Sequence, residues 1–156
     1  LVHKLAPAMR AQHKGAIILV SSMSGLAGGG YVAAYAASKA YEISFAESMW
    51  AELGAEGVDV LGLIAGSTRT PSMERAGLKF APDKGSGSDS LDIVAMDPQD
   101  VAGEALAALG KTPIHVPGEA NRASVTWLRQ APRDEVISTM SAASANMFGL
   151  PPLTRS

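Results

Sequence analysis

Two short runs of apolar, β-branched residues constrain the fold of this chain more than any other feature. Ala16–Val20 reads AIILV, and Val58–Ala65 reads VDVLGLIA. Continuous apolar runs of this length are typical of strands that are covered on both faces. A helical pattern from about Ala34 to Leu53 separates them. A helix between two such strands is the connection that a parallel pair requires, so the order predicts a parallel α/β sheet.

The helical segment between the two runs carries apolar residues at the spacing of one helical turn. Phe45, Met49 and Leu53 form one row, and Ala46 and Trp50 form another. Rows of this kind are typical of the face that a helix turns toward a core.

Further helices and a third strand are predicted around this unit. A helix over residues 1–13 should be bent by Pro7 and stopped by Gly15. Asp97 is suited to cap a helix that runs to Leu109. The remaining predictions are a strand at Pro113–Val116 and helices from Glu119 that Pro132 interrupts and Gly149 ends, with no assignment for residues 74–95. Together they predict a doubly wound parallel sheet of about three strands, seen in part.

Composition excludes several classes of protein. With 47% apolar residues among 156, the chain is too hydrophobic to be disordered and suits one domain. The absence of cysteine excludes a disulfide scaffold and a thiolate metal site. The formal net charge is −2 and the basic residues are dispersed, so nothing indicates a nucleic-acid surface.

The stretch Gly15–Ser38 contains no charged residue and is long enough to span a bilayer. Its centre is rich in serine and includes Gly28, Gly29 and Gly30, which disfavour a helix in lipid. A buried strand followed by a loop explains the stretch better, and we expect no membrane span.

The chain begins at Leu1 and enters a helical pattern directly, without a capping residue or the order of a signal peptide. We therefore expect it to be the C-terminal portion of a longer, cytoplasmic protein.

Tyr35 and Lys39, in the segment YAASK, are the residues that most suggest chemistry. Positions four apart on a helix share a face, so the phenol and the ammonium can reach one site. A nearby cation favours the phenolate form of a tyrosine, which makes the pair a candidate acid/base device for an alcohol oxygen. The spacing alone is common on helix surfaces, and taken by itself it is explained better by a core tyrosine beside a solvated lysine.

The position of Ser22 adds weight to the catalytic interpretation. It directly follows the first predicted strand, and the small-residue loop Gly66–Pro71 follows the second. In open α/β sheets ligands bind beyond the carboxyl ends of the strands. We therefore expect Ser22, the Tyr35 helix and this loop to converge on one site.

Taken together, the stretches GAIILVSSMSG, YAASK and VDVLGLIAGSTRTP resemble the short-chain dehydrogenase/reductases in order and spacing, over about residues 1–118. The resemblance implies that residues 1–118 are the C-terminal half of a Rossmann-type NAD(P)-binding catalytic domain. Residues 119–156 would then be a helical tail that packs on it or on a partner. The implied activity is that of an oxidoreductase, which interconverts a carbonyl and a secondary alcohol by hydride transfer with NAD or NADP.

The resemblance also implies roles for individual residues. Tyr35 would be the catalytic acid/base, Ser22 would hydrogen-bond the reacting oxygen, and Lys39 would assist Tyr35 and bind the nicotinamide ribose. The loop residues that would contact the nicotinamide and the phosphates are Gly66, Thr68 and Thr70. The resemblance further implies a small-molecule carbonyl or alcohol substrate. It also implies a homo-oligomer, in which copies of the protein pair through the helix at residues 34–53 and the helix that ends near Lys14.

The chain departs from the family pattern at two places. Ala65-Gly66 stands where the family commonly has Pro-Gly, and the family's segments for nucleotide binding and its catalytic asparagine are missing. The run GLAGGG at Gly25–Gly30 lacks the spacing of a dinucleotide loop. We therefore expect the chain alone to be inactive. The alternative function is a non-catalytic nucleotide- or partner-binding protein of the same fold.

Several other side chains have ordinary structural explanations. Tyr31 is placed to line the substrate side of a pocket, and Tyr41 is expected to pack. The three histidines lack the spacing of metal ligands. Met73, Leu78 and Phe80 suit either an apolar lid or ordinary packing, and the apolar face at Val125, Trp127 and Leu128 suits docking better than a membrane surface.

Overall fold

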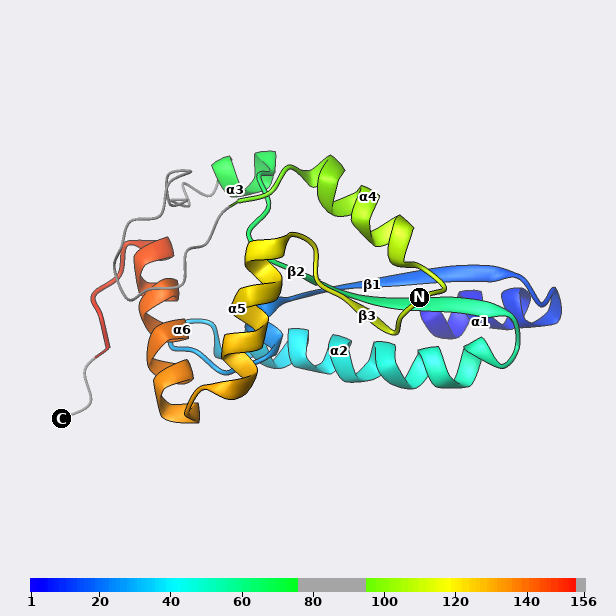
Figure 1. The fold of residues 1–156 in the computed structure, drawn as a ribbon, viewed down its shortest axis with the longest axis horizontal. Coiled ribbons are helices and arrows are strands. Elements are labelled where there is room, and N and C mark those ends of the chain that lie inside the picture. Colours follow the sequence, from blue (N-terminus) through cyan, green and yellow to red (C-terminus); the bar gives the residue numbers. More distant parts are fainter. Residues whose placement is uncertain (76–94, 154–156) are drawn as a thin grey trace.

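The computed structural model describes residues 1–75 and 95–153 of the chain. In these residues, three parallel strands form one sheet in the order β1-β2-β3, namely β1 (Gly15–Ser22), β2 (Val58–Ala65) and β3 (Ile114–His115). The helices are α1 (Val2–Ala11), α2 (Ala33–Gly54), α3 (Pro71–Arg75), α4 (Pro98–Ala108), α5 (Glu119–Gln130) and α6 (Arg133–Phe148). Figure 1 shows α2 and α4 on opposite faces of the sheet and α6 beyond one end of it. This arrangement confirms the predicted α/β fold.

The central strand β2 is apolar along its length because helices cover both of its faces. Leu61 and Leu63 pack with α4 residues on one face. Val58 and Val60 pack with α1 and α2 residues on the other. Four residues of the strand, Val58, Val60, Leu61 and Ile64, have no exposed surface. The bounds of this strand are those that the sequence predicted.

Strand β1 is less covered than its sequence suggested. It lies at an edge of the three-stranded sheet, and Val20 is 54% exposed. Ile17 packs with α1 and α2, and Ile18 packs on the α4 side. In the described residues β1 is therefore contacted on both faces, as expected, but covered only in part. The strand is also longer than predicted, since it continues through Ser22.

Helix α1 ends earlier than predicted. It ends at Ala11, and the chain turns through His13, which has a left-handed φ of 48°. Gly15 is therefore not the residue that ends the helix, but the first residue of β1. Pro7 lies inside α1, and the helix continues through it because the missing N–H removes only one hydrogen bond of the ladder.

In α2 the two residues of one predicted apolar row differ in burial. Ala46 is fully buried, whereas Trp50 is 42% exposed. Four residues rotate a helix by about 400°, so a row at this spacing drifts away from the buried face. Leu53, in the other row, is buried.

The C-terminal helices pack on the turn that follows β1. Leu128 of α5 and Val136 and Met140 of α6 form a buried cluster with Ala27, and Trp127 packs against it. As predicted from the sequence, a break at Pro132 separates the two helices, and Gly149 ends α6 with a left-handed φ of 65°. The apolar face of α5 is thus directed to the rest of the chain.

The uncharged stretch Gly15–Ser38 is divided among β1, a short 3₁₀ turn at Met23–Gly25 and the start of α2. Among the helices of the described residues, none is both long enough and apolar enough to cross a membrane.

A hydrogen-bond network around Glu104 joins α4 to β3 and α5. Its carboxylate accepts bonds from the Gly118 N–H at 3.1 Å, from His115 Nε2 at 3.1 Å and from Arg122 Nη1 at 3.2 Å. Burial acts to raise the pKa of Glu104, but the bonds from Gly118, His115 and Arg122 together outweigh it and hold the pKa below its ordinary value of 4.5. The ionised carboxylate therefore stabilises the junction.

We predict that Glu104→Gln lowers the free energy of unfolding by about 1 kcal/mol at neutral pH, because a neutral amide cannot pair with Arg122. A carboxylate with a lowered folded pKa contributes fully above its ordinary value, and the contribution is lost as the pH falls through the folded value. Urea unfolding at pH 7 and at a pH well below 4.5 measures the effect. The difference in free energy of unfolding between parent and variant should be smaller at the lower pH.

Glu47→Gln, at an exposed position of α2, is the matched control and should change stability by less than about 0.5 kcal/mol. A parent-to-variant difference for Glu104 that stays constant over this pH range would contradict the prediction.

Candidate active site

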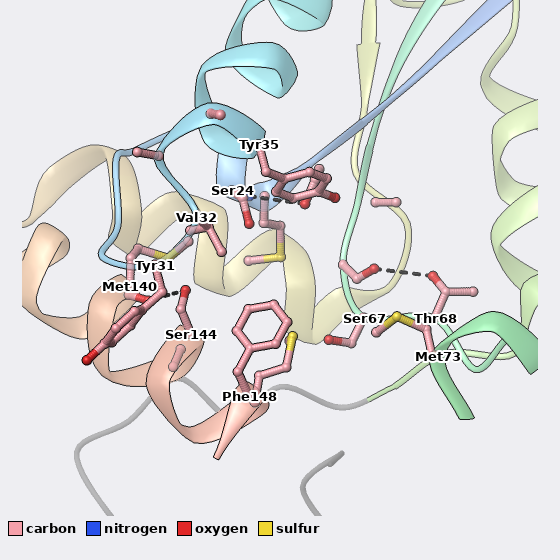
Figure 2. Close-up of a pocket in the computed structure, with 18 of the residues that line it drawn as sticks. Ser24, Tyr31, Val32, Tyr35, Ser67, Thr68, Met73, Met140, Ser144 and Phe148 are labelled. Atoms are coloured by element: carbon pink, nitrogen blue, oxygen red, sulfur yellow. Dashed lines mark hydrogen bonds between the residues drawn. The ribbon is translucent and has the colours of Figure 1, made fainter. Parts of the chain in front are cut away.

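A cavity of about 650 Å³ lies where the ends of β1 and β2, the start of α2 and helix α6 meet. Figure 2 shows that side chains from all sides of the cavity point into it, with Tyr35 and Phe148 facing each other. The residues that line it include Ser22, Tyr35, Gly66, Thr68 and Thr70, which are five of the six predicted site residues. The sixth, Lys39, lies beside the cavity and does not line it.

Ser22 reaches this cavity because it is the last residue of β1. Successive side chains of a strand point to opposite faces. Ser21 is 2% exposed, and its hydroxyl donates to the Lys39 carbonyl at 2.7 Å. Ser22 consequently points the other way, and its Oγ accepts a hydrogen bond from the Ser24 N–H at 3.2 Å. The structure thus directs the two neighbouring serines to opposite sides of the strand.

Tyr35 lies in the first turn of α2 and is 49% exposed. The Lys39 Nζ lies 5.8 Å from the centre of its ring. This ammonium also donates to the Val20 carbonyl at 2.9 Å and pairs with Glu42 Oε2 at 2.8 Å. A phenol that faces a cavity with an ammonium next to it is suited to exchange a proton with a bound alcohol.

The partner Glu42 was not identified from the sequence. The spacing of three residues between Lys39 and Glu42 on one helix is the signal that could have revealed the pair.

The loop after β2 is held on two sides. Backbone hydrogen bonds join Arg69 N to the Met96 carbonyl and Met96 N to the Ser67 carbonyl, each at 2.9 Å. Behind it, Gly66 lies so close to Asn121 that a Cβ at this position would be 2.5 Å from Asn121 Oδ1. Asn121 is itself buried and donates to the Pro117 carbonyl at 2.8 Å. The loop is therefore a supported wall of the cavity.

Helix α6 supplies a wall that the sequence analysis did not identify. Met140, Met147 and Phe148 line the cavity, and Met73 of α3 lines it from another side. The Ser144 hydroxyl, also in this wall, donates to the Met140 carbonyl at 2.9 Å. Nothing local in the sequence marks these residues, because α6 reaches the site only through tertiary packing. Leu78 and Phe80, the other two residues of the expected lid, lie outside the described residues.

The competing candidates occupy different places. Tyr31 lines the cavity, as expected. Tyr41 is 64% exposed, and its ring stacks on Phe45 at a centroid distance of 5.4 Å, so the expected packing is limited to its own helix. His115 bonds Glu104, and His13 bonds the Glu56 carbonyl. Over the ranges that the structure describes, no three histidine, aspartate or glutamate side chains form a metal-binding group.

Comparison with known proteins agrees with the fold. The family described as short chain dehydrogenase matches residues 1–79. The chain belongs to this family.

Two curated relatives are both named 7beta-hydroxysteroid dehydrogenase. The protein from Collinsella aerofaciens is 33% identical over 133 residues, which cover 85% of this chain and 49% of the relative. The protein from Mediterraneibacter gnavus is 34% identical with the same coverage. A solved structure described as that of a 7beta-hydroxysteroid dehydrogenase has a TM-score of 0.73 and 32% identity, and the match covers 88% of this chain and 50% of that one. The chain spans about half the length of the curated relatives that it matches.

The contact between Gly66 and Asn121 yields a prediction about stability. We expect Gly66→Ala to lower the free energy of unfolding by about 1–3 kcal/mol, because the added methyl group would overlap a buried, hydrogen-bonded amide. Thermal unfolding of parent and variant measures the effect.

Gly103→Ala in α4 is the control of opposite sign. An added Cβ there meets nothing within 4 Å, so the variant should gain up to about 1 kcal/mol from helix propensity. Equal melting temperatures for the parent and Gly66→Ala would show that the loop can shift to accept the methyl group without loss of stability. Asn121 would then not support the loop.

Proposed function

We propose that the protein containing this chain is an oxidoreductase that interconverts a carbonyl and a secondary alcohol by hydride transfer with NAD or NADP. The observation that carries the proposal is the cavity that receives both the Tyr35 phenol and Ser22, with the Lys39 ammonium 5.8 Å from the ring of Tyr35. A site that only binds nucleotide has no need of a phenol and a cation arranged in this way.

Each of the three side chains has a distinct role in the proposed reaction. During oxidation the proton of the substrate hydroxyl passes to the Tyr35 oxygen, and during reduction Tyr35 returns it to the carbonyl oxygen. Ser22 donates a hydrogen bond to that same oxygen and holds it against Tyr35. Lys39 favours the phenolate form by its charge. A bound nicotinamide cofactor would supply the other half of the chemistry, the transfer of hydride to or from the substrate carbon that carries this oxygen.

The residues present suit the nicotinamide end of such a cofactor. Thr68 and Thr70 bring hydroxyl groups to the cavity, and Gly66 brings unhindered backbone to it. These groups follow β2 at the same edge of the sheet as Ser22. We propose that they hold the nicotinamide and its ribose, whereas the remaining nucleotide contacts require residues outside this chain.

We further propose that the substrate is a hydroxysteroid or the corresponding ketone. The walls away from Tyr35 carry apolar side chains from three elements, which include Met23, Met73, Met147 and Phe148. The volume of about 650 Å³ lies within the usual range for sites that bury a ring-based small molecule. The relatives named 7beta-hydroxysteroid dehydrogenase support the same substrate class.

The test of the chemistry is Tyr35→Phe in the full-length protein. We expect turnover of a 7β-hydroxysteroid to fall at least about a hundredfold, because the phenylalanine ring keeps the shape but cannot carry the proton. Nucleotide affinity, measured by titration of NAD and NADP, should stay within about twofold of the parent value, that is, within about 0.4 kcal/mol.

Tyr41→Phe removes the same hydroxyl from an exposed tyrosine of the same helix and is the matched control. Turnover that survives in Tyr35→Phe would refute the proton-transfer role. A parent protein that binds nucleotide but oxidises no alcohol would favour the non-catalytic alternative.

We also propose that the protein forms a homo-oligomer through the side of α2 that carries Trp50. Trp50 is 42% exposed on this helix, which leaves a large apolar side chain in solvent. Tryptophan is one of the residue types enriched at association surfaces. Light scattering of the full-length protein should give more than one chain per particle, and Trp50→Glu should shift it toward the monomer. A parent protein that is monomeric at all concentrations would contradict this proposal.

A further inference from the structure

The chain that leaves α6 is fastened to the loop between Ser22 and Tyr35. Helix α6 ends at Phe148 with Gly149 as its cap, and the Leu150 N–H turns back to the Ala145 carbonyl at 2.8 Å. The next residue, Pro151, accepts a hydrogen bond at 2.7 Å from the hydroxyl of Tyr31. The two partners are 120 positions apart in the sequence, so this bond closes a long-range contact.

The same loop holds α6 at neighbouring points. The Gly30 N–H donates to Ser141 Oγ at 2.8 Å. A Cβ on Gly30 would overlap Leu153 Cδ1, so Leu153 packs directly on this glycine. Arg133 Nη1, at the start of α6, donates to the Leu26 carbonyl at 3.0 Å. The loop thus contacts α6 and the segment after it along their length.

The backbone of Tyr31 indicates that this contact is a constrained one. Its φ of 66° lies in the left-handed region, which a tyrosine rarely adopts. Such a conformation is unfavourable for a residue with a Cβ and persists only where the surroundings hold it. The hydrogen bond to Pro151 is one of the interactions that hold it.

Tyr31 also lines the cavity, so one side chain joins the anchor to the site. It lines the cavity, together with Met147 and Phe148 from the last turn of α6. Figure 2 shows Tyr31 next to Met140 at one side of the cavity, and Phe148 reaching toward Tyr35 from another. The hydroxyl that bonds Pro151 is therefore on the far end of a wall residue.

We propose that Tyr31 is a positioning residue for substrate selection, because its hydroxyl anchors Pro151 and thereby holds Met147 and Phe148 in place as the wall that a bulky apolar substrate contacts. This inference rests on the proposed function and adds to it the residue that sets the shape of the substrate side. It assigns Tyr31 no part in proton transfer.

The physical consequence concerns binding more than chemistry. Without the anchor, the end of α6 samples more conformations, and a substrate that packs on it must order it on binding. A large ring system contacts this wall, whereas a small alcohol held at Tyr35 and Ser22 contacts it little. Loss of the anchor should therefore raise KM for the large substrate and change kcat less.

The experiment compares Tyr31→Phe with the parent full-length protein on a 7β-hydroxysteroid and on cyclohexanol. Removal of the hydroxyl alone keeps the ring in the wall. The ratio of kcat/KM for the steroid to kcat/KM for cyclohexanol should fall about threefold to tenfold, the effect expected for one hydrogen bond, and mainly through KM. Leu153→Ala, which trims an exposed residue outside the cavity lining, should shift the ratio in the same direction.

Tyr41→Phe is the matched hydroxyl deletion and should leave the ratio unchanged. An unchanged ratio in both Tyr31→Phe and Leu153→Ala would overturn the inference. An equal loss on the two substrates, carried by kcat, would also overturn it, because it would assign Tyr31 to the chemical step.

A binding measurement separates this inference from the proposed function. Calorimetric titration of the steroid onto each variant measures the steroid Kd, which depends on the α6 wall and needs no turnover. If the parent oxidises neither alcohol, the proposed function fails. In that event, a steroid Kd raised at least threefold by Tyr31→Phe and not by Tyr41→Phe supports the positioning role of Tyr31. An unchanged Kd, or no steroid binding by the parent protein, overturns that role.

Discussion

The parallel register of β1 and β2 is the constraint on which the candidate site depends. Ser22 pairs with Ala65, so both strands end at the same edge of the sheet. The hydroxyl at the end of one strand and the loop after the other consequently meet. A shift of one residue would direct Ser21 into the cavity and bury Ser22, because side chains alternate along a strand. The apolar faces of β2, which are buried against different helices, oppose such a shift.

The lysine of the site also fastens α2 to β1. Its carbonyl accepts from Ser21 at 2.7 Å, and its Nζ donates to the Val20 carbonyl at 2.9 Å. Gly25 permits this approach, since a Cβ there would lie 2.7 Å from the Lys39 carbonyl carbon. These contacts set α2 against the strand end, and Tyr35, one turn earlier, is carried to the cavity as a result. The first glycine of GLAGGG thus serves close packing.

Local patterns predicted the parts of the fold that local forces decide. The bounds of β2 follow from its apolar run, and the Asp97 side chain accepts from the Gln99 N–H at 2.8 Å as a helix cap should. Patterns failed where distant residues decide the outcome. The exposure of Val20 depends on what lies beside β1, and the contact between Tyr31 and Pro151 joins residues that no spacing relates. The α6 wall was missed for the same reason.

The candidate site therefore draws its polar groups and its apolar wall from different parts of the chain. The groups suited to proton transfer come from the stretch between Ser22 and Lys39, where a strand end and a helix start are adjacent in the sequence. The apolar wall comes largely from α6, which only tertiary contacts bring near. Substitutions in α6 can then alter the space for a substrate without disturbing Tyr35. Because the loop between Ser22 and Tyr35 contacts α6, the length and glycine content of that loop constrain the position of the α6 wall as well as that of Tyr35.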